Sequence, residues 1–164
     1  MLPDALSAQP VVAALVARGA EAITGGSLVR GEMALEIAPG EIVGVCTFLK
    51  HELEFNRLSA VTAVDRYPAA PRFEVIYHLH SLPRNERLRL KCFVGAGDDG
   101  GEIDSVTGVW AGADWYEREV YDLFGVKFRN HPDMTRIMMP DEWVGHPLRK
   151  DYPVHGHKYS YQSE

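Results

Sequence analysis

The sequence predicts an α+β domain in which helices cover a mainly antiparallel or mixed sheet, followed by an irregular, proline-rich C-terminal tail. Several segments place apolar residues at helical spacing, and others alternate apolar and polar residues as half-buried strands do. Residues 131–153 contain four prolines, too many for a long helix or a central strand. A chain of 164 residues suits a single domain. We therefore expect a domain over residues 1–128 and a tail over residues 129–164.

Two helices are predicted in the first third of the chain. The first spans residues 4–18 and stops at Gly19, which is typical of a helix end. Its apolar face consists of Val11, Val12, Leu15 and Val16. The second opens at residues 39–41 and continues to about residue 53. Its inner stripe consists of Ile42, Cys46, Leu49 and Leu53.

Strands are predicted where β-branched and aromatic residues alternate with polar ones. The predicted strands cover residues 28–37, 59–66, 72–80 and 87–94. The last two are separated by a short segment with Pro83 and Asn85, so we expect an antiparallel hairpin. The glycine-rich residues 95–101 indicate a loop.

A third helix is predicted over residues 114–124. Asp114 is expected to cap its first turn, with Glu117 three residues later in a capping-box arrangement, and Gly125 fits the position after its end. Arg118 lies four residues from both Asp114 and Asp122, so we expect two carboxylates to flank it. The apolar stripe consists of Tyr116, Val120, Leu123 and Phe124.

Charge is distributed unevenly along this acidic chain, whose formal net charge is −6. Residues 72–94 hold five basic and two acidic residues, whereas residues 95–122 hold one basic and eight acidic residues. This pattern suggests internal pairing or complementary partners. The basic face of the last predicted strand, with Arg87, Arg89 and Lys91, is either solvated or meets a partner. The net charge argues against non-specific nucleic-acid binding.

No motif for catalysis, cofactor binding or metal binding is found, and we expect none of these sites. Cys46 and Cys92 are far apart and fall within apolar patterns, which predicts buried, inert thiols and suits a reducing compartment. His78 with His80, and His155 with His157, have no third ligand at a convincing spacing. Phosphate-binding glycine motifs and a GxSxG elbow do not occur. The N-terminus does not read as a signal peptide, and apolar stretches are too short to span a bilayer.

A partner-binding surface is the functional hypothesis that the residues favour. Aromatic residues and arginine, which dominate protein–protein hot spots, crowd the third predicted helix, and the tail is apolar yet irregular. We expect interface residues Trp115, Glu117, Arg118, Asp122, His131, Arg136, Trp143, His146, Arg149, Lys150 and Asp151. In the tail, Arg149 is suited to grip a carboxylate. The rival hypothesis is a stand-alone enzyme that uses Glu117, Asp122 and His146 as acid and base.

A family resemblance lies in three blocks. Residues 115–125, WYEREVYDLFG, resemble the ERExxDLFG signature of the 30 kDa subunit (C) of bacterial respiratory complex I, the proton-pumping NADH–quinone oxidoreductase. Residues 131–140 and 143–153 are similar to the rest of that family's C-terminal half, and the resemblance covers about residues 40–155. Small departures occur at Asn130, Met134 and Thr135.

The resemblance implies a cofactor-free, non-catalytic subunit of the peripheral arm. In that family the 30 kDa subunit packs against the quinone-site subunit (D), which helps form the site where quinone binds, and lies near subunits B and I. The complex passes electrons from NADH to quinone and pumps protons. The resemblance places this chain on the cytoplasmic side of the bacterial inner membrane, attached peripherally through the complex. An equivalent scaffold in a membrane-bound hydrogenase-type complex is the alternative.

Overall fold

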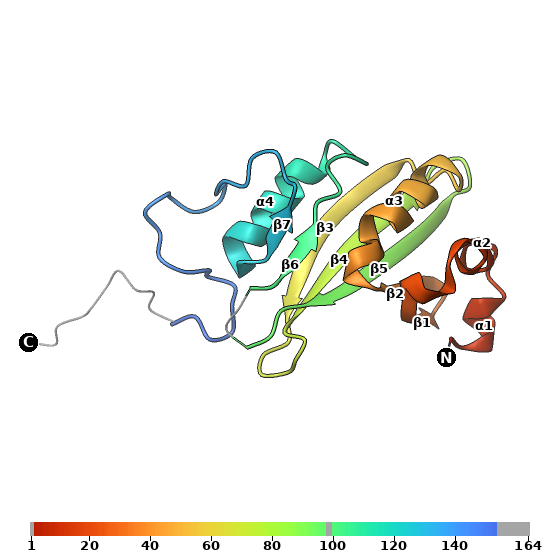
Figure 1. Ribbon diagram of the computed structural model, residues 1–164, viewed down its shortest axis with the longest axis horizontal. Helices are drawn as coiled ribbons and strands as arrows, with labels where there is room; N and C mark the ends of the chain where they lie inside the picture. The colour runs from red at the N-terminus through yellow and green to blue at the C-terminus, as the bar shows by residue number, and fades with distance from the viewer. Residues whose placement is uncertain (1, 98–99, 154–164) are drawn as a thin grey trace, which may run out of the picture.

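The computed structural model describes residues 2–97 and 100–153 and confirms the α+β prediction (Figure 1). Its main sheet has five strands in the order β1-β2-β5-β4-β3. These strands are β1 (Ile23–Val29), β2 (Glu32–Ile37), β3 (Arg57–Asp65), β4 (Phe73–Ser81) and β5 (Glu86–Val94). The helices are α1 (Asp4–Ser7), α2 (Pro10–Arg18), α3 (Ile42–His51) and α4 (Ala113–Phe124), with short 3-10 turns η1 (Ala20–Ala22) and η2 (Pro39–Glu41). No helix within these described residues is long and apolar enough to cross a bilayer.

The sheet is mixed because one strand pair is parallel. β2 runs parallel to β5, whereas β1–β2, β3–β4 and β4–β5 are antiparallel. The predicted β4–β5 hairpin is confirmed, with pairs running from Phe73 opposite Val94 to Ser81 opposite Glu86. Alternate residues of each strand therefore form two faces of one twisted sheet.

The hydrophobic core lies on one of these two faces. β4 contributes Phe73, Val75, Tyr77 and Leu79, and the matching residues of β5 are Leu88, Leu90, Cys92 and Val94. The apolar faces of α2, α3 and α4 pack into the same cluster. Cys46 and Cys92 are both buried free thiols, as predicted, and burial raises the pKa of Cys92 to about 12. Their chemistry is that of small apolar side chains.

The first predicted helix is wrong in detail, because the chain breaks between α1 and α2. Pro10 lacks a backbone N–H and forces the preceding Gln9 into an extended conformation, with φ −75° and ψ 131°. Pro10 instead begins α2, where its missing donor costs nothing. The second predicted helix is confirmed but ends at His51, so that Leu53 lies beyond it.

The single strand predicted over residues 28–37 is instead a hairpin of β1 and β2. Its turn lies at Arg30 and Gly31, both of which have positive φ values of 54° and 81°. Gly26 lies within β1, where a Cβ atom would lie 2.6 Å from Leu6 Cδ2. The missing side chain thus lets α1 pack closely against this strand.

A second, two-stranded parallel sheet was not predicted. It pairs β6 (Glu102–Asp104) with β7 (Lys127–Arg129), the segments on either side of α4. The capping-box prediction for α4 is wrong: its N-cap is Gly112, without a side-chain hydrogen bond, and Asp114 lies inside the helix. Gly125 is confirmed in the left-handed position after the helix, with φ 81°.

The buried hydroxyl of Tyr77 yields a stability prediction. This hydroxyl has no hydrogen-bond partner among the described residues, and burial of an unpaired polar group costs free energy. We expect Tyr77→Phe to raise the free energy of unfolding by about 1 kcal/mol, measured from the midpoint of urea denaturation. A decrease in stability would mean that the hydroxyl is satisfied in solution.

Candidate functional site

Asp122 on α4 holds the tail at residues 137–139, which form neither helix nor strand. Its side chain is fully buried, and Oδ2 accepts hydrogen bonds from the backbone N–H groups of Ile137 (3.1 Å), Met138 (2.8 Å) and Met139 (2.8 Å). Oδ1 pairs with Nη1 of Arg136 at 2.5 Å. Burial alone would raise the pKa of Asp122, but these four donors outweigh it and hold the pKa below its usual value. The carboxylate is thus ionised and saturated.

The tail in return caps the C-terminal end of α4. The last carbonyl groups of a helix have no partner within the helix. Here the Asp122 carbonyl lies 2.9 Å from His146 Nδ1, the Leu123 carbonyl accepts from Leu148 N (3.0 Å), and the Phe124 carbonyl accepts from Arg149 Nε (2.6 Å). The positive charge of Arg149 also suits the negative end of the helix dipole.

His146 acts in this cap as a neutral group. Burial lowers its pKa, and the nearby charges of Arg149 and Arg136 lower it further, although the contact with the Asp122 carbonyl raises it. The contact with a carbonyl oxygen requires the proton on Nδ1. Its ring also packs edge-on against Tyr121, with centroids 6.0 Å apart.

An ion-pair cluster around the buried guanidinium of Arg72 ties the end of the described tail to the main sheet. Arg72, which precedes β4 and is 1% exposed, forms two hydrogen bonds with Asp65 at the end of β3, at 3.0 and 2.9 Å. It also donates to both carboxylate oxygens of Asp151, at 2.9 and 2.7 Å. Asp65 accepts a further hydrogen bond from Lys150 N at 2.8 Å. One guanidinium thus joins two carboxylates from distant parts of the chain.

The pKa values around Arg72 are set by this pairing. Burial would raise the pKa of Asp65, but hydrogen bonds from Arg72 and two backbone N–H groups lower it to about 2. The hydrogen bonds with Asp65 and Asp151 raise the pKa of Arg72 above its usual value. All three groups therefore stay charged at neutral pH.

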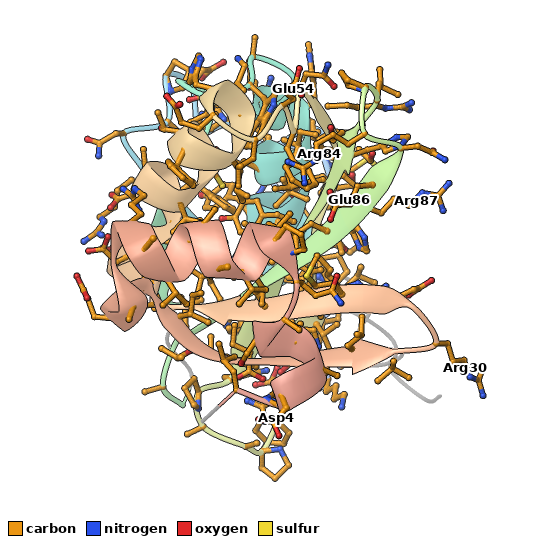
Figure 2. All side chains as sticks on the ribbon, turned by 90° about the vertical axis from the view of Figure 1, so that its right-hand side faces the viewer. Asp4, Arg30, Glu54, Arg84, Glu86 and Arg87 are labelled. Carbon is orange, nitrogen blue, oxygen red and sulfur yellow. The ribbon has the colours of Figure 1, made fainter. Side chains whose placement is uncertain are left out.

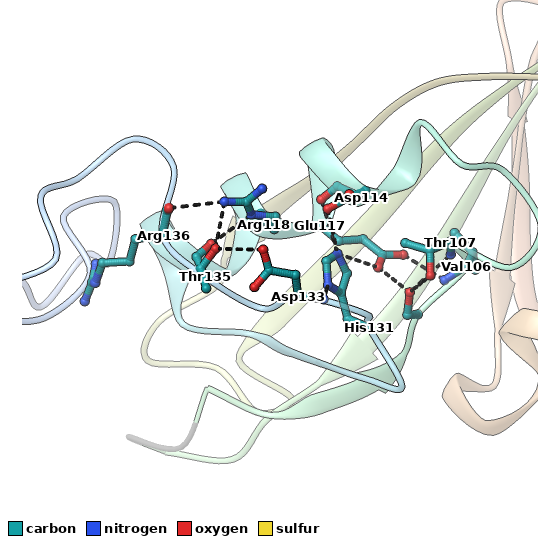
Figure 3. Close-up of polar contacts among 10 residues, drawn as sticks. Val106, Thr107, Asp114, Glu117, Arg118, His131, Asp133, Thr135 and Arg136 are labelled. Carbon is teal, nitrogen blue, oxygen red and sulfur yellow. Dashed lines mark hydrogen bonds and ion pairs between the residues drawn. The ribbon is translucent and has the colours of Figure 1, made fainter.

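Glu117 forms a different kind of site, in which the carboxyl is buried without a cation in its first contacts (Figure 3). Oε2 accepts from Ser105 Oγ at 2.6 Å, and Oε1 accepts from Val106 N at 2.7 Å. Burial raises the pKa of Glu117 to about 7, an effect that Asp114 reinforces and that the two hydrogen bonds oppose. Glu117 thus joins the segment before α4 to the helix itself.

His131 begins the tail beside this carboxyl. Its ring is fully buried, with Nε2 3.3 Å from the Asp114 carbonyl and 3.9 Å from Glu117 Oε2. Nδ1 accepts a hydrogen bond from Asp133 N at 3.0 Å, which leaves the proton on Nε2 in the neutral ring. The side chain therefore fixes the start of the tail against the first turn of α4.

Arg118 differs from its prediction, because no carboxylate pairs with it among the described residues. Its guanidinium donates instead to the carbonyl and hydroxyl oxygens of Thr135, at 3.1 and 2.7 Å, and to the Arg136 carbonyl at 3.4 Å (Figure 3). It also lies over the Trp115 ring, 5.2 Å from the centroid. The Asp122 carboxylate, which was expected to pair with Arg118, instead binds Arg136 and the backbone of residues 137–139.

The structure brings most of the predicted interface residues together, but as contacts within this chain. Glu117 and Asp122 are fully buried within the chain, so neither side chain is exposed on its surface. Trp115 is 62% exposed, whereas Trp143 is half-buried. Sequence reasoning missed Arg72, Asp65 and Ser105 as partners. A signal for the Asp65–Arg72 pair was available in the sequence, because the two opposite charges lie at the end of one predicted strand and the start of the next.

The apolar surface left over by these contacts is the feature suited to binding. Four large apolar side chains of α4 and the tail remain more than half exposed: Trp115 (62%), Met138 (59%), Val144 (63%) and Leu148 (53%). We call these four residues the apolar tail surface. The Asp122 carboxylate and the carbonyl groups at the end of α4, which bind the neighbouring tail, are already paired within the chain, so these four side chains offer hydrophobic contact.

Acid–base chemistry receives no support from this geometry. The Asp122 carboxylate is fully buried and its strong contacts are made within the chain, and the Glu117 carboxyl is likewise enclosed. No group of three or more metal-ligating side chains gathers in the part of the chain that the structure describes. His155 and His157 lie outside the described residues.

Comparison with known proteins connects this site to a family. The family model described as "Respiratory-chain NADH dehydrogenase, 30 Kd subunit" matches residues 35–158. In Geotalea uraniireducens, the NADH-quinone oxidoreductase subunit that is designated C is 54% identical over 127 residues, which is 77% of this chain and 76% of that protein. Its counterpart of the same name in Geobacter sulfurreducens is 53% identical over 128 residues, 77% of this chain and 78% of that one.

Two solved structures share the fold. A trypsin-resistant fragment of Nqo5 has a TM-score of 0.63 and 29% identity, and the match covers 74% of this chain and 96% of the fragment. A chain of the membrane-bound sulfane sulfur reductase, an archaeal respiratory membrane complex, has a TM-score of 0.75 at 24% identity, with 88% of this chain and 84% of that chain covered. The second likeness concerns the fold alone.

Removal of the Asp122 carboxylate should detach the tail. Asp122→Ala leaves three backbone N–H groups and Arg136 without their acceptor, so we expect a loss of about 3 kcal/mol or more in unfolding free energy. Urea denaturation and limited proteolysis of residues 131–153 measure the effect. Asp141→Ala, an exposed acid of the same segment, is the matched control and should leave both readouts unchanged. Equal behaviour of the two variants would contradict the anchoring role.

Glu117 should make stability fall as pH rises. Its folded pKa of about 7 lies above the ordinary value of 4.5, so the protonated form favours folding and this contribution is lost as pH rises through 7. Relative to Glu117→Gln, which imitates the protonated carboxyl, the native chain should lose about 3 kcal/mol between pH 5 and pH 9. Denaturation curves at several pH values test this. Glu119→Gln, an exposed control on the same helix, should keep the native slope.

Proposed function

Because the chain belongs to the family of the 30 kDa subunit of respiratory-chain NADH dehydrogenase, we propose that it is a cofactor-free structural subunit of an NADH–quinone oxidoreductase. In this proposal it belongs to the peripheral arm and carries out no redox step itself. The complete complex transfers electrons from NADH to quinone and couples the transfer to proton translocation. The chain contributes a rigid surface to this assembly.

The quinone-site subunit (D) is the proposed main partner. The supporting observation is the apolar tail surface, which stays exposed although the tail backbone beside it is hydrogen-bonded to α4. Large apolar side chains that remain exposed are candidates for contact with a partner protein. A surface that is already ordered loses little conformational entropy on binding, which favours affinity. We propose residues 129–164 as the partner-binding segment.

In our proposal, some of the predicted interface residues do not contact the partner but hold the partner-binding segment in place. His131, Arg136, His146, Arg149 and Asp151 hold the segment to α4 and the sheet, and thereby position Met138, Val144 and Leu148. Trp115, Trp143 and Lys150 are proposed as direct contacts. Subunits B and I are the proposed neighbours, on the cytoplasmic side of the inner membrane.

The hydrogenase-type alternative has less support. Relatives with 54%, 53% and 52% identity are all named as the C component of NADH-quinone oxidoreductase. The archaeal sulfane sulfur reductase shares the fold at 24% identity, which carries no functional argument. The chains that co-purify with this protein from membranes distinguish the two complexes directly.

A matched pair of leucines tests the apolar tail surface. Leu148 is 53% exposed in the tail, and Leu82 is 56% exposed in the β4–β5 turn. Burial of a leucine side chain is worth about 2 kcal/mol, so Leu148→Ser should weaken binding to the quinone-site subunit roughly tenfold or more. Titration of this purified partner with each variant measures the dissociation constant.

The control decides what the result means. Leu82→Ser should bind the quinone-site subunit like the native chain, since the turn lies outside the proposed surface. A chain truncated after Phe128 should show a larger loss than Leu148→Ser. Equal recovery of the partner with the native, truncated and Leu148→Ser chains would contradict the proposal.

A further inference from the structure

The sheet face opposite the core carries an excess of positive charge. Alternation and register place on this face one row of residues from each strand, including the basic face predicted for β5. The strands contribute four basic residues to this face, Arg57, Arg87, Arg89 and Lys91, and Arg30 and Arg66 lie beside it. Its acidic residues are Glu32, Glu36 and Glu74. We call this set the cationic face; it lies on a chain whose formal net charge is −6.

Internal pairing accounts for only part of this charge. Arg89 pairs with Glu32 at 3.1 Å, and Lys91 pairs with Glu74 at 2.7 Å. Arg30, Arg57 and Arg87 have no ion pair or hydrogen bond with any side chain among residues 2–97 and 100–153, and all three are exposed (Figure 2 shows Arg30 and Arg87). Three guanidinium groups on one side of the molecule are therefore free to bind an anion.

The register aligns two of these arginines. Arg57 of β3 lies opposite His80 of β4, and His80 lies opposite Arg87 of β5, so the three side chains form one row across three strands. Two strand spacings separate the arginine backbones by about 10 Å. Nε2 of His80, between them, is buried and has no hydrogen-bond partner in the described structure. Pairs of opposite charge on neighbouring strands stabilise a sheet, but this row contains no acidic residue. A carboxylate from outside the chain would supply the missing negative charge.

A hollow adjoins this row on β1, β2 and β5. Its volume is about 400 Å³, and its lining includes the small side chains of Ser27 and Ala34. Arg30, Arg89 and Lys91 also line it, together with the acid Glu32, so basic residues outnumber acidic ones there three to one. Nε of Arg89 is buried there without a hydrogen-bond partner among the described residues, although its terminal nitrogen is paired with Glu32. The hollow thus combines space for a side chain with the exposed guanidinium of Arg30.

We propose that the cationic face docks an acidic polypeptide segment of a neighbouring subunit. One carboxylate would pair with the arginines of the Arg57–His80–Arg87 row, and another would enter the hollow beside Arg30 and Arg89. The interspersed acids Glu32, Glu36 and Glu74 oppose a continuous anionic surface such as a membrane, whereas a polypeptide can place carboxylates between them. The inference rests on the proposed function in one respect, namely that the partner belongs to the same assembly. The cationic face itself is separate from the apolar tail surface, so the two surfaces can be tested independently.

Charge reversal within the complete complex tests the docking. Arg57→Glu/Arg87→Glu should release one neighbouring subunit roughly tenfold more readily than the native chain, or more, when the purified complex is washed with rising salt. Arg18→Glu/Lys127→Glu is the matched control, with the same charge change at exposed positions away from this face. Retention equal to that of the control would overturn the proposal. If only Leu148→Ser releases the quinone-site subunit, the result supports the apolar tail surface as an interface and contradicts docking at the cationic face.

A cross-link identifies the occupant independently of any charge variant. Val29 is 60% exposed and lines the hollow, and both native cysteines are buried, so Val29→Cys accepts a thiol-directed photo-cross-linker selectively. Mass spectrometry should find a segment of another subunit that contains Asp or Glu. Replacing those acids with Lys should restore retention of Arg57→Glu/Arg87→Glu. A cross-link to lipid, to a second copy or to a segment without acids, or no cross-link, would overturn the proposal.

Discussion

The contact between the Asp122 carboxylate and three successive backbone N–H groups is the constraint on which the tail depends. A chain segment without helix or sheet leaves its backbone donors unpaired, and unpaired donors cannot be buried cheaply. Asp122 satisfies those of Ile137, Met138 and Met139 at a single oxygen atom. The irregular path of the tail at residues 137–139 is therefore fixed by its contact with α4.

The dependence is mutual, because the tail completes the helix. The carbonyls of Asp122, Leu123 and Phe124 end α4 without partners of their own and are met by tail residues. Gly125 makes this possible: a Cβ there would lie 2.3 Å from Arg149 Nη2 and 2.6 Å from the His146 ring. The left-handed turn after the helix and the close approach of the tail are thus two consequences of one residue.

Local patterns predicted local structure, and contacts between distant residues were beyond them. The spacing of Tyr116, Val120 and Phe124 correctly predicted α4, and alternation predicted the β4–β5 hairpin. The same logic assigned Arg118 to the acids four residues away, whereas its partners lie 17 and 18 residues later. Arg72 and Asp151 are 79 residues apart, a pairing that no short-range rule could find. Several residues of the candidate site were predicted from the sequence, but Arg72, Asp65 and Ser105 were missed, and the patterns did not indicate what the predicted residues bind.

Buried charges are a costly way to hold a tail in place, which indicates what they contribute. Apolar residues of similar size often give equal or greater stability, because charges lose their hydration on burial. A carboxylate that receives three N–H groups, or a guanidinium that grips two carboxylates, accepts one backbone geometry, whereas an apolar contact tolerates several registers. If the chain acts as the structural subunit proposed above, a defined surface matters more to it than added stability. The ionic anchors at Asp122 and Arg72 therefore explain how an irregular segment can present Met138, Val144 and Leu148 in one arrangement.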